Sequence, residues 1–322
     1  MTNASPAVQP PLRVGVVGVG YLGRFHARIY SSLPGVSLVG VADVDVARAQ
    51  QVAAEYGCAA YGDPAALLDK VEAVSIVVPT VYHAEVARPY LERGVHMLME
   101  KPLAPTLAEA TALVELAERC GVVFQVGHLE RFNAGIMALA ARAAAPRFIE
   151  VHRLGTFVDR ATDVDVVTDL MIHDIDIVLG LFGSPIKRIS AQGTPVLTEH
   201  IDIANARIEF EGGAVANVTA SRVSAKKLRR IRVFSRDHYY GLDYIDQKLE
   251  IVRAVPDPDG GKWPKIVTES IAIEPRPPLD TELEHFVRAV RARTRPLVDG
   301  RVGLDALRVA LLVKESIAAC PP

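Results

Sequence analysis

A glycine-rich segment near the start of the chain has the composition of a phosphate-binding turn. It consists of Gly18-Val-Gly20-Tyr21-Leu22-Gly23, after an apolar run and before a helix-like pattern. In that context the first glycine permits a tight turn, the second lets the backbone approach a pyrophosphate, and the third lets the helix pack closely on the strand. The N–H groups at the helix N-terminus then bind the phosphates. We expect a dinucleotide site here; the alternative is a glycine-rich turn that binds no ligand.

Asp43 lies at the end of the next apolar run, 25 positions after Gly18. A carboxylate at this position accepts hydrogen bonds from a ribose diol and repels a 2′-phosphate. The sequence therefore favours NAD over NADP as the cofactor. The alternative is that Asp43 only caps the following helix.

Two groups of polar residues directly follow later apolar runs. In an open parallel sheet, ligands bind at the carboxyl ends of the strands, which is where these residues would lie. The first comprises Pro79 and Thr80, with His83 three residues further on. We expect all three to line the cofactor site, together with Glu100 and Lys101 from the second group. Equally, Thr80 could cap a helix and His83 could be a packed histidine.

Lys101 precedes a proline, which favours an extended backbone. A lysine held beside a cationic nicotinamide ring has a lowered pKa and can exchange protons near neutral pH, and Glu100 could orient it. The alternative is an ordinary solvated Glu100–Lys101 pair.

A third group contains Asp169, His173 and Asp176, spaced i, i+4 and i+7. On a regular helix these residues share one face, which makes His173 a candidate proton-transfer group flanked by carboxylates. In the alternative, Asp169 is an N-cap and His173 and Asp176 form a structural pair.

Further polar residues are candidates for contact with an anionic or sugar substrate. They are Arg131 and Asn133 in the segment 127–133, and Arg222 after a strand-like run. The basic run 226–232 is a further candidate, because arginine binds phosphate through two hydrogen bonds, but we interpret it as a solvated strand edge because the chain as a whole is nearly neutral. No metal site is predicted.

The first 125 or so residues alternate apolar strand-like runs with amphipathic helical segments, which predicts a doubly wound α/β fold with a parallel sheet. The expected strands are 12–19, 36–42, 73–78, 96–99 and 122–126, and the expected helices are 21–32, 46–56, 83–93 and 106–119.

After residue 130 the pattern changes to alternating strands separated by turn residues, which predicts an open, mostly antiparallel sheet. The expected strands are 147–154, 186–191, 202–210, 214–221, 229–234 and 248–253, with helices at 132–145, 280–293 and 303–318. We therefore expect a flexible lead-in (1–11), an NAD-binding Rossmann domain (12–127) and a substrate-binding and oligomerisation α+β domain (128–322).

The composition excludes several classes of protein. The 322 residues are 50% hydrophobic and carry a formal net charge of −2, unlike a disordered chain or a nucleic-acid-binding protein. No apolar run is long enough to span a membrane, and the N-terminus lacks the pattern of a secretory signal. The three widely spaced cysteines suit a reducing compartment, so we expect a cytoplasmic location.

Taken together, GVVGVGYLG, VPTVYHAEV, GVHMLMEKP and the Asp169–His173 pair resemble the Gfo/Idh/MocA family of oxidoreductases in order and spacing. The resemblance implies a Rossmann domain followed by an open-sheet domain, and an NAD(P)-dependent enzyme acting on CH–OH groups. It also implies that Lys101 and His173 form the catalytic pair, with either as the proton acceptor, and that Asp169 helps to position the substrate hydroxyl.

The segments VGHLERFN (126–133), VVTDLMIHDIDI (166–177) and ASRVS (220–224) resemble a narrower group, the UDP-N-acetylglucosamine 3-dehydrogenases. This implies oxidation of a nucleotide-sugar hydroxyl to a ketone, in aminosugar synthesis for lipid A or surface glycans, by a homodimer or homotetramer that pairs through the open sheet. The alternatives are a dehydrogenase of a free sugar or polyol such as inositol, a reductase working in the opposite direction, and a non-catalytic NAD-binding regulator.

Overall fold

The computed structural model describes residues 10–158, 164–257, 259 and 262–319. It separates into two compact units, which are described one at a time. The first holds the chain up to Gly127 together with Leu279–Leu304, and the second holds His128–Pro278 and the chain from Asp305 onward. The division after Gly127 coincides with the predicted boundary. Residues 279–304, in contrast, pack with the first unit although the sequence analysis assigned them to the second domain.

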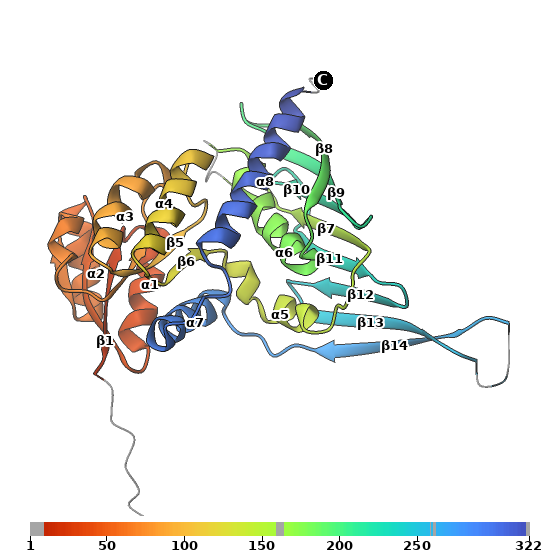
Figure 1. Ribbon diagram of the computed structural model, residues 1–322, viewed down its shortest axis with the longest axis horizontal. Helices are drawn as coiled ribbons and strands as arrows, with labels where there is room; N and C mark the ends of the chain where they lie inside the picture. Colours follow the sequence, from red (N-terminus) through yellow and green to blue (C-terminus); the bar gives the residue numbers. More distant parts are fainter. Residues whose placement is uncertain (1–9, 159–163, 258, 260–261, 320–322) are drawn as a thin grey trace, which may run out of the picture. The chain divides into compact units, whose positions relative to one another are not determined.

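The first unit is a doubly wound α/β domain, as predicted. Its six parallel strands lie in the order β3-β2-β1-β4-β5-β6, with helices α1 to α4 between them (Figure 1). The strands are β1 Leu12–Val17, β2 Val36–Ala42, β3 Ala59–Tyr61, β4 Ala73–Ile76, β5 His96–Glu100 and β6 Phe124–Gly127. The helices are α1 Tyr21–Ser32, α2 Val46–Tyr56, α3 His83–Glu92 and α4 Leu107–Arg119. Strand β3 was not predicted, because three residues are too few to form a recognisable pattern.

Helix α7 (Pro278–Ala292) explains why the late segment returns to the first unit. Its buried residues Leu283, Phe286 and Val290 belong to the same apolar cluster as Ile29 and Tyr30 of α1. Burial of apolar area is the main stabilising contribution to such a contact. The next helix, α8 (Gly300–Ala319), begins among residues of the first unit and continues in the second.

The second unit contains the predicted open sheet. Its eight strands lie in the order β14-β13-β12-β11-β7-β10-β9-β8, and all neighbours are antiparallel except β7 and β10. The strands are β7 Phe148–Leu154, β8 Ile186–Thr194, β9 Ile203–Phe210, β10 Val215–Ser221, β11 Leu228–Phe234, β12 His238–Asp243, β13 Lys248–Val255 and β14 Lys265–Ala272. Strands β12 and β14 were not predicted. Nearly every residue of β14 is exposed, so burial imposes no alternation on this strand. Strand β14 lies at one end of the sheet, beside β13 (Figure 1).

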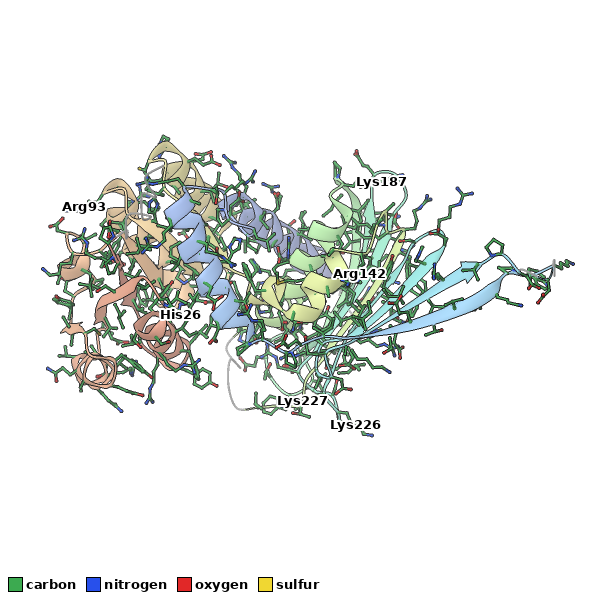
Figure 2. All side chains as sticks on the ribbon, turned by 90° about the horizontal axis from the view of Figure 1, so that it is seen from below. His26, Arg93, Arg142, Lys187, Lys226 and Lys227 are labelled. Atoms are coloured by element: carbon green, nitrogen blue, oxygen red, sulfur yellow. The ribbon has the colours of Figure 1, made fainter. Side chains whose placement is uncertain are left out.

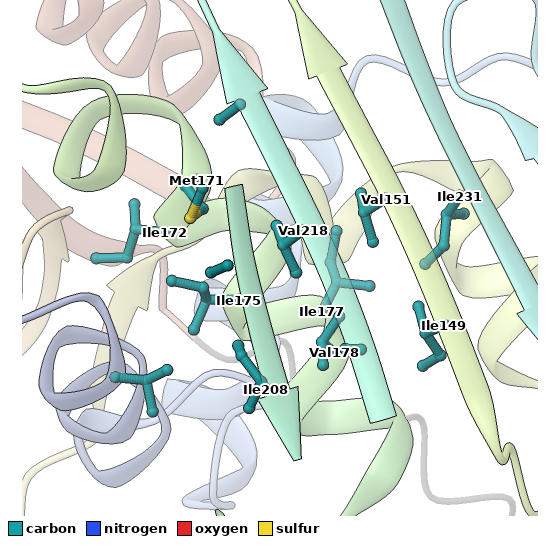
Figure 3. Close-up of a cluster of buried hydrophobic side chains, with 14 of the residues drawn as sticks. Ile149, Val151, Met171, Ile172, Ile175, Ile177, Val178, Ile208, Val218 and Ile231 are labelled. Carbon is teal, nitrogen blue, oxygen red and sulfur yellow. The ribbon is translucent and has the colours of Figure 1, made fainter. Parts of the chain in front are cut away.

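One face of this sheet is buried beneath helix α6 (Ile172–Phe182). Figure 3 shows Ile149 and Val151 of β7 and Val218 of β10 gathered with Ile175 and Val178 of α6. The opposite face carries polar pairs, among them one between Arg232 and Glu150. This division explains the alternating sequence of β7, β9 and β10.

Three local features differ from the sequence analysis. The basic run 226–232 leads into β11, an interior strand between β7 and β12, so it is not at a sheet edge; Lys226 and Lys227 lie side by side just before it (Figure 2). Helix α5 covers only Ala134–Ala140, because Asn133 caps its start. The helix expected around Asp169 begins with a wider π turn, Val167–Met171, before α6, so a 3.6-residue period does not describe it.

Candidate functional site

The glycine turn of the first unit has the geometry that a pyrophosphate needs. Gly18 has a φ of +84°, and a Cβ there would lie 2.4 Å from the carbonyl oxygen of Val77. A Cβ on Gly23 would lie 1.9 Å from the carbonyl oxygen of Gly18, whereas the space beside Gly20 is open. No side chain caps the N-terminus of α1, and helix N-termini are a common place for phosphate oxygens to bind. The glycines thus have the three roles that the spacing predicts, and the turn fits a dinucleotide.

The Asp43 carboxylate is held beside this turn. It accepts the N–H of Val19 at 2.9 Å and the N–H of Asp45 at 2.9 Å, and Arg48 Nη1 lies 3.6 Å away. A cavity of about 660 Å³ adjoins the turn and is lined by Gly20 and Tyr21, among others. Leu22 is half-buried on α1. The cavity and carboxylate suit the adenosine end of NAD.

The loops after β4 and β5 are joined by His83. Its Nε2 lies 3.0 Å from the carbonyl oxygen of Val78, and its Nδ1 lies 3.3 Å from that of Leu103. The side chain is 1% exposed, and burial lowers its pKa, so the ring is neutral and donates to one of the two carbonyls. His83 therefore matches the packed-histidine alternative, since both ring nitrogens face backbone. Pro79 is exposed and Thr80 half-buried on the adjoining 3-10 turn, Thr80–Tyr82.

Glu100 is buried, which does not fit the solvated Glu100–Lys101 pair. Its Oε1 lies 3.3 Å from Nε2 of the fully buried His26 on α1. A Cβ on Gly127, its neighbour on β6, would lie 2.8 Å from Glu100 Oε2, so the carboxyl group fits only against a glycine. Lys101 follows at the carboxyl edge of the sheet, half-buried, with a cis bond to Pro102. The close packing around Glu100 restricts the backbone from which Lys101 projects.

In the second unit, His173 lies in the first turn of α6 and is 8% exposed. Its ring contacts that of His128 edge-to-face, with centroids 6.0 Å apart. Asp169 is half-buried in the π turn that precedes it. Asp176 pairs with Arg131, whose Nη1 lies 3.2 Å from Oδ1, and burial raises the pKa of Asp176 to about 7. Asp176 is thus paired with Arg131.

A buried charge network next to His173 was not predicted. Arg153 of β7 donates to both carboxylate oxygens of Asp174, at 2.7 and 2.8 Å, and to Glu130 Oε1 at 2.8 Å. Burial lowers the pKa of Arg153, but Asp174 and Glu130 raise it more, so that it lies well above its ordinary value. Burial raises the pKa of Glu130, but Arg153 and Arg229 lower it more, so that it lies below its ordinary value. The sequence did contain a signal for this network, because the alternation of β7 places Arg153 on the buried face of the strand, where a charged side chain needs a partner.

The predicted substrate contacts have partners inside the second unit. Asn133 accepts the N–H groups of Gly135 and Ile136 and so caps α5, and Arg131 pairs with Asp176. Arg222 Nη2 donates to the carbonyl oxygen of Val164 at 2.7 Å. The structure therefore gives these three side chains stabilising roles that the sequence analysis did not anticipate.

Two further features bear on the kind of site. Among the described residues, no group of three or more His, Cys, Asp or Glu side chains is placed to hold a metal ion. Within the same residues, none of the helices combines the length and apolar character needed to cross a membrane.

Comparisons with known proteins identify the family. Residues 12–128 match the model of the oxidoreductase family with an NAD-binding Rossmann fold, and residues 136–238 match the GFO/IDH/MocA C-terminal domain. The chain belongs to the Gfo/Idh/MocA oxidoreductases and is an NAD-dependent enzyme.

Individual relatives narrow the comparison. The chain is 39% identical over 309 residues to UDP-N-acetylglucosamine 3-dehydrogenase of Acidithiobacillus ferrooxidans, covering 96% of this chain and 98% of that protein. A solved structure of that enzyme superposes with a TM-score of 0.89, covering 97% of this chain and 99% of the other. The scyllo-inositol 2-dehydrogenase of Bacillus subtilis is 33% identical over 66% of this chain and 68% of its own. Levoglucosan dehydrogenase, solved with NADH, shares the fold with a TM-score of 0.83 at 20% identity, covering 96% of this chain and 97% of that one.

Proposed function

We propose that this enzyme oxidises the 3-hydroxyl group of UDP-N-acetylglucosamine or a close relative to a ketone. The observation that carries the proposal is end-to-end similarity to a dehydrogenase of that substrate, 39% identical over 96% of the chain. The dinucleotide turn supports it, because NAD, when bound, supplies the hydride acceptor. The resulting 3-ketone is the kind of product that an aminotransferase consumes, which suits aminosugar synthesis for lipid A or surface glycans.

Two side chains are proposed to move the hydroxyl proton. Lys101 projects from a backbone anchored by buried Glu100, and His173 is held on α6 against His128. Either can accept a proton from a substrate hydroxyl, and Asp169 is proposed to help orient that hydroxyl. Proton transfer of this kind contributes about 10²–10⁴-fold to a rate.

The test is turnover of UDP-N-acetylglucosamine with NAD, followed as NADH absorbance, in wild type and in Lys101→Met and His173→Asn. We expect turnover in wild type and a fall in kcat of at least about 100-fold in the variant that lacks the proton acceptor, with NAD affinity retained. A wild-type enzyme that binds NAD and does not oxidise the nucleotide sugar would refute the proposal.

A second candidate is oxidation of a free polyol, favoured by the 33% identity to scyllo-inositol 2-dehydrogenase. Measuring kcat/KM for myo-inositol, scyllo-inositol and the nucleotide sugar separates the two candidates. A higher kcat/KM for an inositol than for the nucleotide sugar would favour the polyol.

We also propose that the enzyme is a homodimer or homotetramer that pairs through the open face of the eight-stranded sheet. Support comes from an aromatic group on that face, where the rings of Phe234 and Tyr239 lie 5.0 Å apart and Phe148 adjoins Phe234. Sedimentation of wild type against Phe234→Glu tests it, and a wild-type monomer would overturn it. A cytoplasmic location is proposed as well, supported by the free thiols of Cys58 and Cys120.

A further inference from the structure

The second unit contains a cavity whose lining includes Asn133, one of the predicted substrate contacts. It has a volume of about 550 Å³, within the range of small-molecule sites, and its walls come from that unit alone. The lining includes Glu130, Arg229 of β11 and Tyr244, together with Arg276 from the segment before α7.

The cavity is rich in guanidinium groups. Arg229 and Arg276 both line it. The carboxylate of Glu130 is already paired with the buried Arg153 at 2.8 Å, so the Arg229 contact at 3.2 Å brings a second cation to the same oxygen. The side chain of Arg229 is 49% exposed and can turn its remaining N–H groups toward a ligand. Planar donors such as the guanidinium groups of Arg229 and Arg276 suit a phosphate-bearing ligand.

Tyr244 adds a hydrogen-bond donor at the wall. It is 5% exposed, and among the described residues its hydroxyl has no hydrogen-bond partner. Burial is the largest of the effects that raise its pKa, so the hydroxyl keeps its proton and is available as a donor. A buried polar group without a partner is costly in free energy, and a ligand oxygen would remove that cost.

The cavity is connected to His173 by the charge network. Arg153 bridges Glu130, in the cavity wall, and Asp174, the residue after His173. Because Arg153 holds both carboxylates and Glu130 in turn holds Arg229, a ligand bound by Arg229 has a defined position relative to the first turn of α6. That is the arrangement required for binding energy from a remote part of a substrate to orient its reacting part.

We propose that this cavity binds the diphosphate of the nucleotide-sugar substrate, with Arg229 and Arg276 as its cationic ligands and Tyr244 as a neutral donor. The inference rests on the proposed function, since it supplies that substrate with a subsite.

The test compares Arg229→Gln, Arg276→Gln and Tyr244→Phe with wild type. Arg230→Gln is the matched control, because Arg230 is the next residue of β11, points to the open face and lies 3.5 Å from the Tyr239 hydroxyl. Measured quantities are kcat and KM for UDP-N-acetylglucosamine, KM for NAD, and the Kd of UDP and of inorganic pyrophosphate by calorimetry. Thermal melts identify any variant that fails to fold. Because the three substitutions lie on separate segments, the remaining variants still test the inference if one of them does not fold.

We expect Arg229→Gln and Arg276→Gln to raise KM for the nucleotide sugar and Kd for UDP by about 10-fold or more, with kcat and KM for NAD within about 3-fold. Tyr244→Phe should have a smaller effect of the same kind, and Arg230→Gln none. Changes below 2-fold in both arginine variants, or equal losses in Arg230→Gln, would overturn the inference.

The two proposals can fail separately. Wild-type turnover of the nucleotide sugar with unchanged KM in the arginine variants overturns only the subsite. Absence of turnover, with UDP or pyrophosphate binding that Arg229→Gln weakens, overturns the proposed substrate and leaves an anion site. If wild type neither binds these anions nor oxidises the nucleotide sugar, both proposals are wrong.

Discussion

Replacing Asp43 by Asn should shift the cofactor preference from NAD toward NADP. The carboxylate lies beside the glycine turn, held by the N–H groups of Val19 and Asp45. Arg48 lies 3.6 Å from the carboxylate, and both Arg48 and Arg24 line the cavity that adjoins the glycine turn. Removing the negative charge leaves these two guanidinium groups in position to attract a 2′-phosphate.

The magnitude follows from two contributions. A hydrogen bond from a ribose hydroxyl to a carboxylate contributes about 1.5–3 kcal/mol, and a neutral amide recovers roughly half of it, so kcat/KM with NAD should fall about 3- to 10-fold. Two unit charges about 4 Å apart near a surface repel by about 4 kcal/mol before screening. If screening leaves half of this, kcat/KM with NADP rises about 30-fold, and the ratio of the two specificities changes by roughly 100-fold.

The assay is kcat/KM with each cofactor at saturating substrate, in low and high salt, because the gain with NADP is electrostatic and should shrink with salt. Asp45→Asn is the control: Asp45 Oδ2 lies 3.0 Å from Arg48 Nη2, but its carboxylate caps α2. An amide can accept only one of the two N–H groups that Asp43 accepts, so thermal melts accompany the kinetics. The role assigned to Asp43 would be refuted if the ratio of kcat/KM with NADP to kcat/KM with NAD in Asp43→Asn stayed within 3-fold of wild type, or if Asp45→Asn changed this ratio equally.

Three further predictions concern stability and cofactor binding. Arg153→Met leaves Glu130 and Asp174 buried without their shared cation and should lower the free energy of unfolding by about 3–5 kcal/mol in urea melts, so a loss below 1 kcal/mol contradicts the network. The pKa of Asp176 is raised to about 7 in the folded protein, above its ordinary value, so the folded state holds this proton more tightly and the resulting stability is lost as pH rises from about 4 through 7. Between pH 5 and 8, wild type should therefore lose at least about 1 kcal/mol of stability relative to Asp176→Asn, and parallel pH profiles would show that the group is not buried as described. Gly23→Ala places a Cβ against the Gly18 carbonyl and should weaken NAD binding by about 10-fold or more in a titration, whereas an unchanged Kd would mean that the turn is not the pyrophosphate site.

The dinucleotide site was predictable because its determinants are local. Glycine spacing, the apolar runs around it and the position of Asp43 fix which backbone groups meet at the ends of β1 and β2. The parallel sheet followed from continuous Val, Ile and Leu runs, and the open sheet followed from alternation. Such patterns arise from the periods of strand and helix, which any short segment carries with it.

Other features depended on partners far away in the chain. Capping of α5 by Asn133 has a local signal, because Asn before a helical run favours the N-cap position, but nothing near Asn133 indicates its bond to Gln247. Similarly, the sequence around Asp176 does not identify Arg131 as its partner. The sequence also assigned α7 to the wrong neighbours, because a single amphipathic stripe does not specify which core it will cover.

The sequence by itself therefore determined the class of fold and the cofactor, and it supplied the candidates proposed for proton transfer. Only the tertiary structure decided which charged groups are consumed by internal pairing, such as Arg153 with Glu130 and Asp174, and which line a cavity, such as Arg229 and Arg276. The physical reason is that local periodicity sets a side chain's face, whereas its burial and its partner depend on the segments that pack against that face.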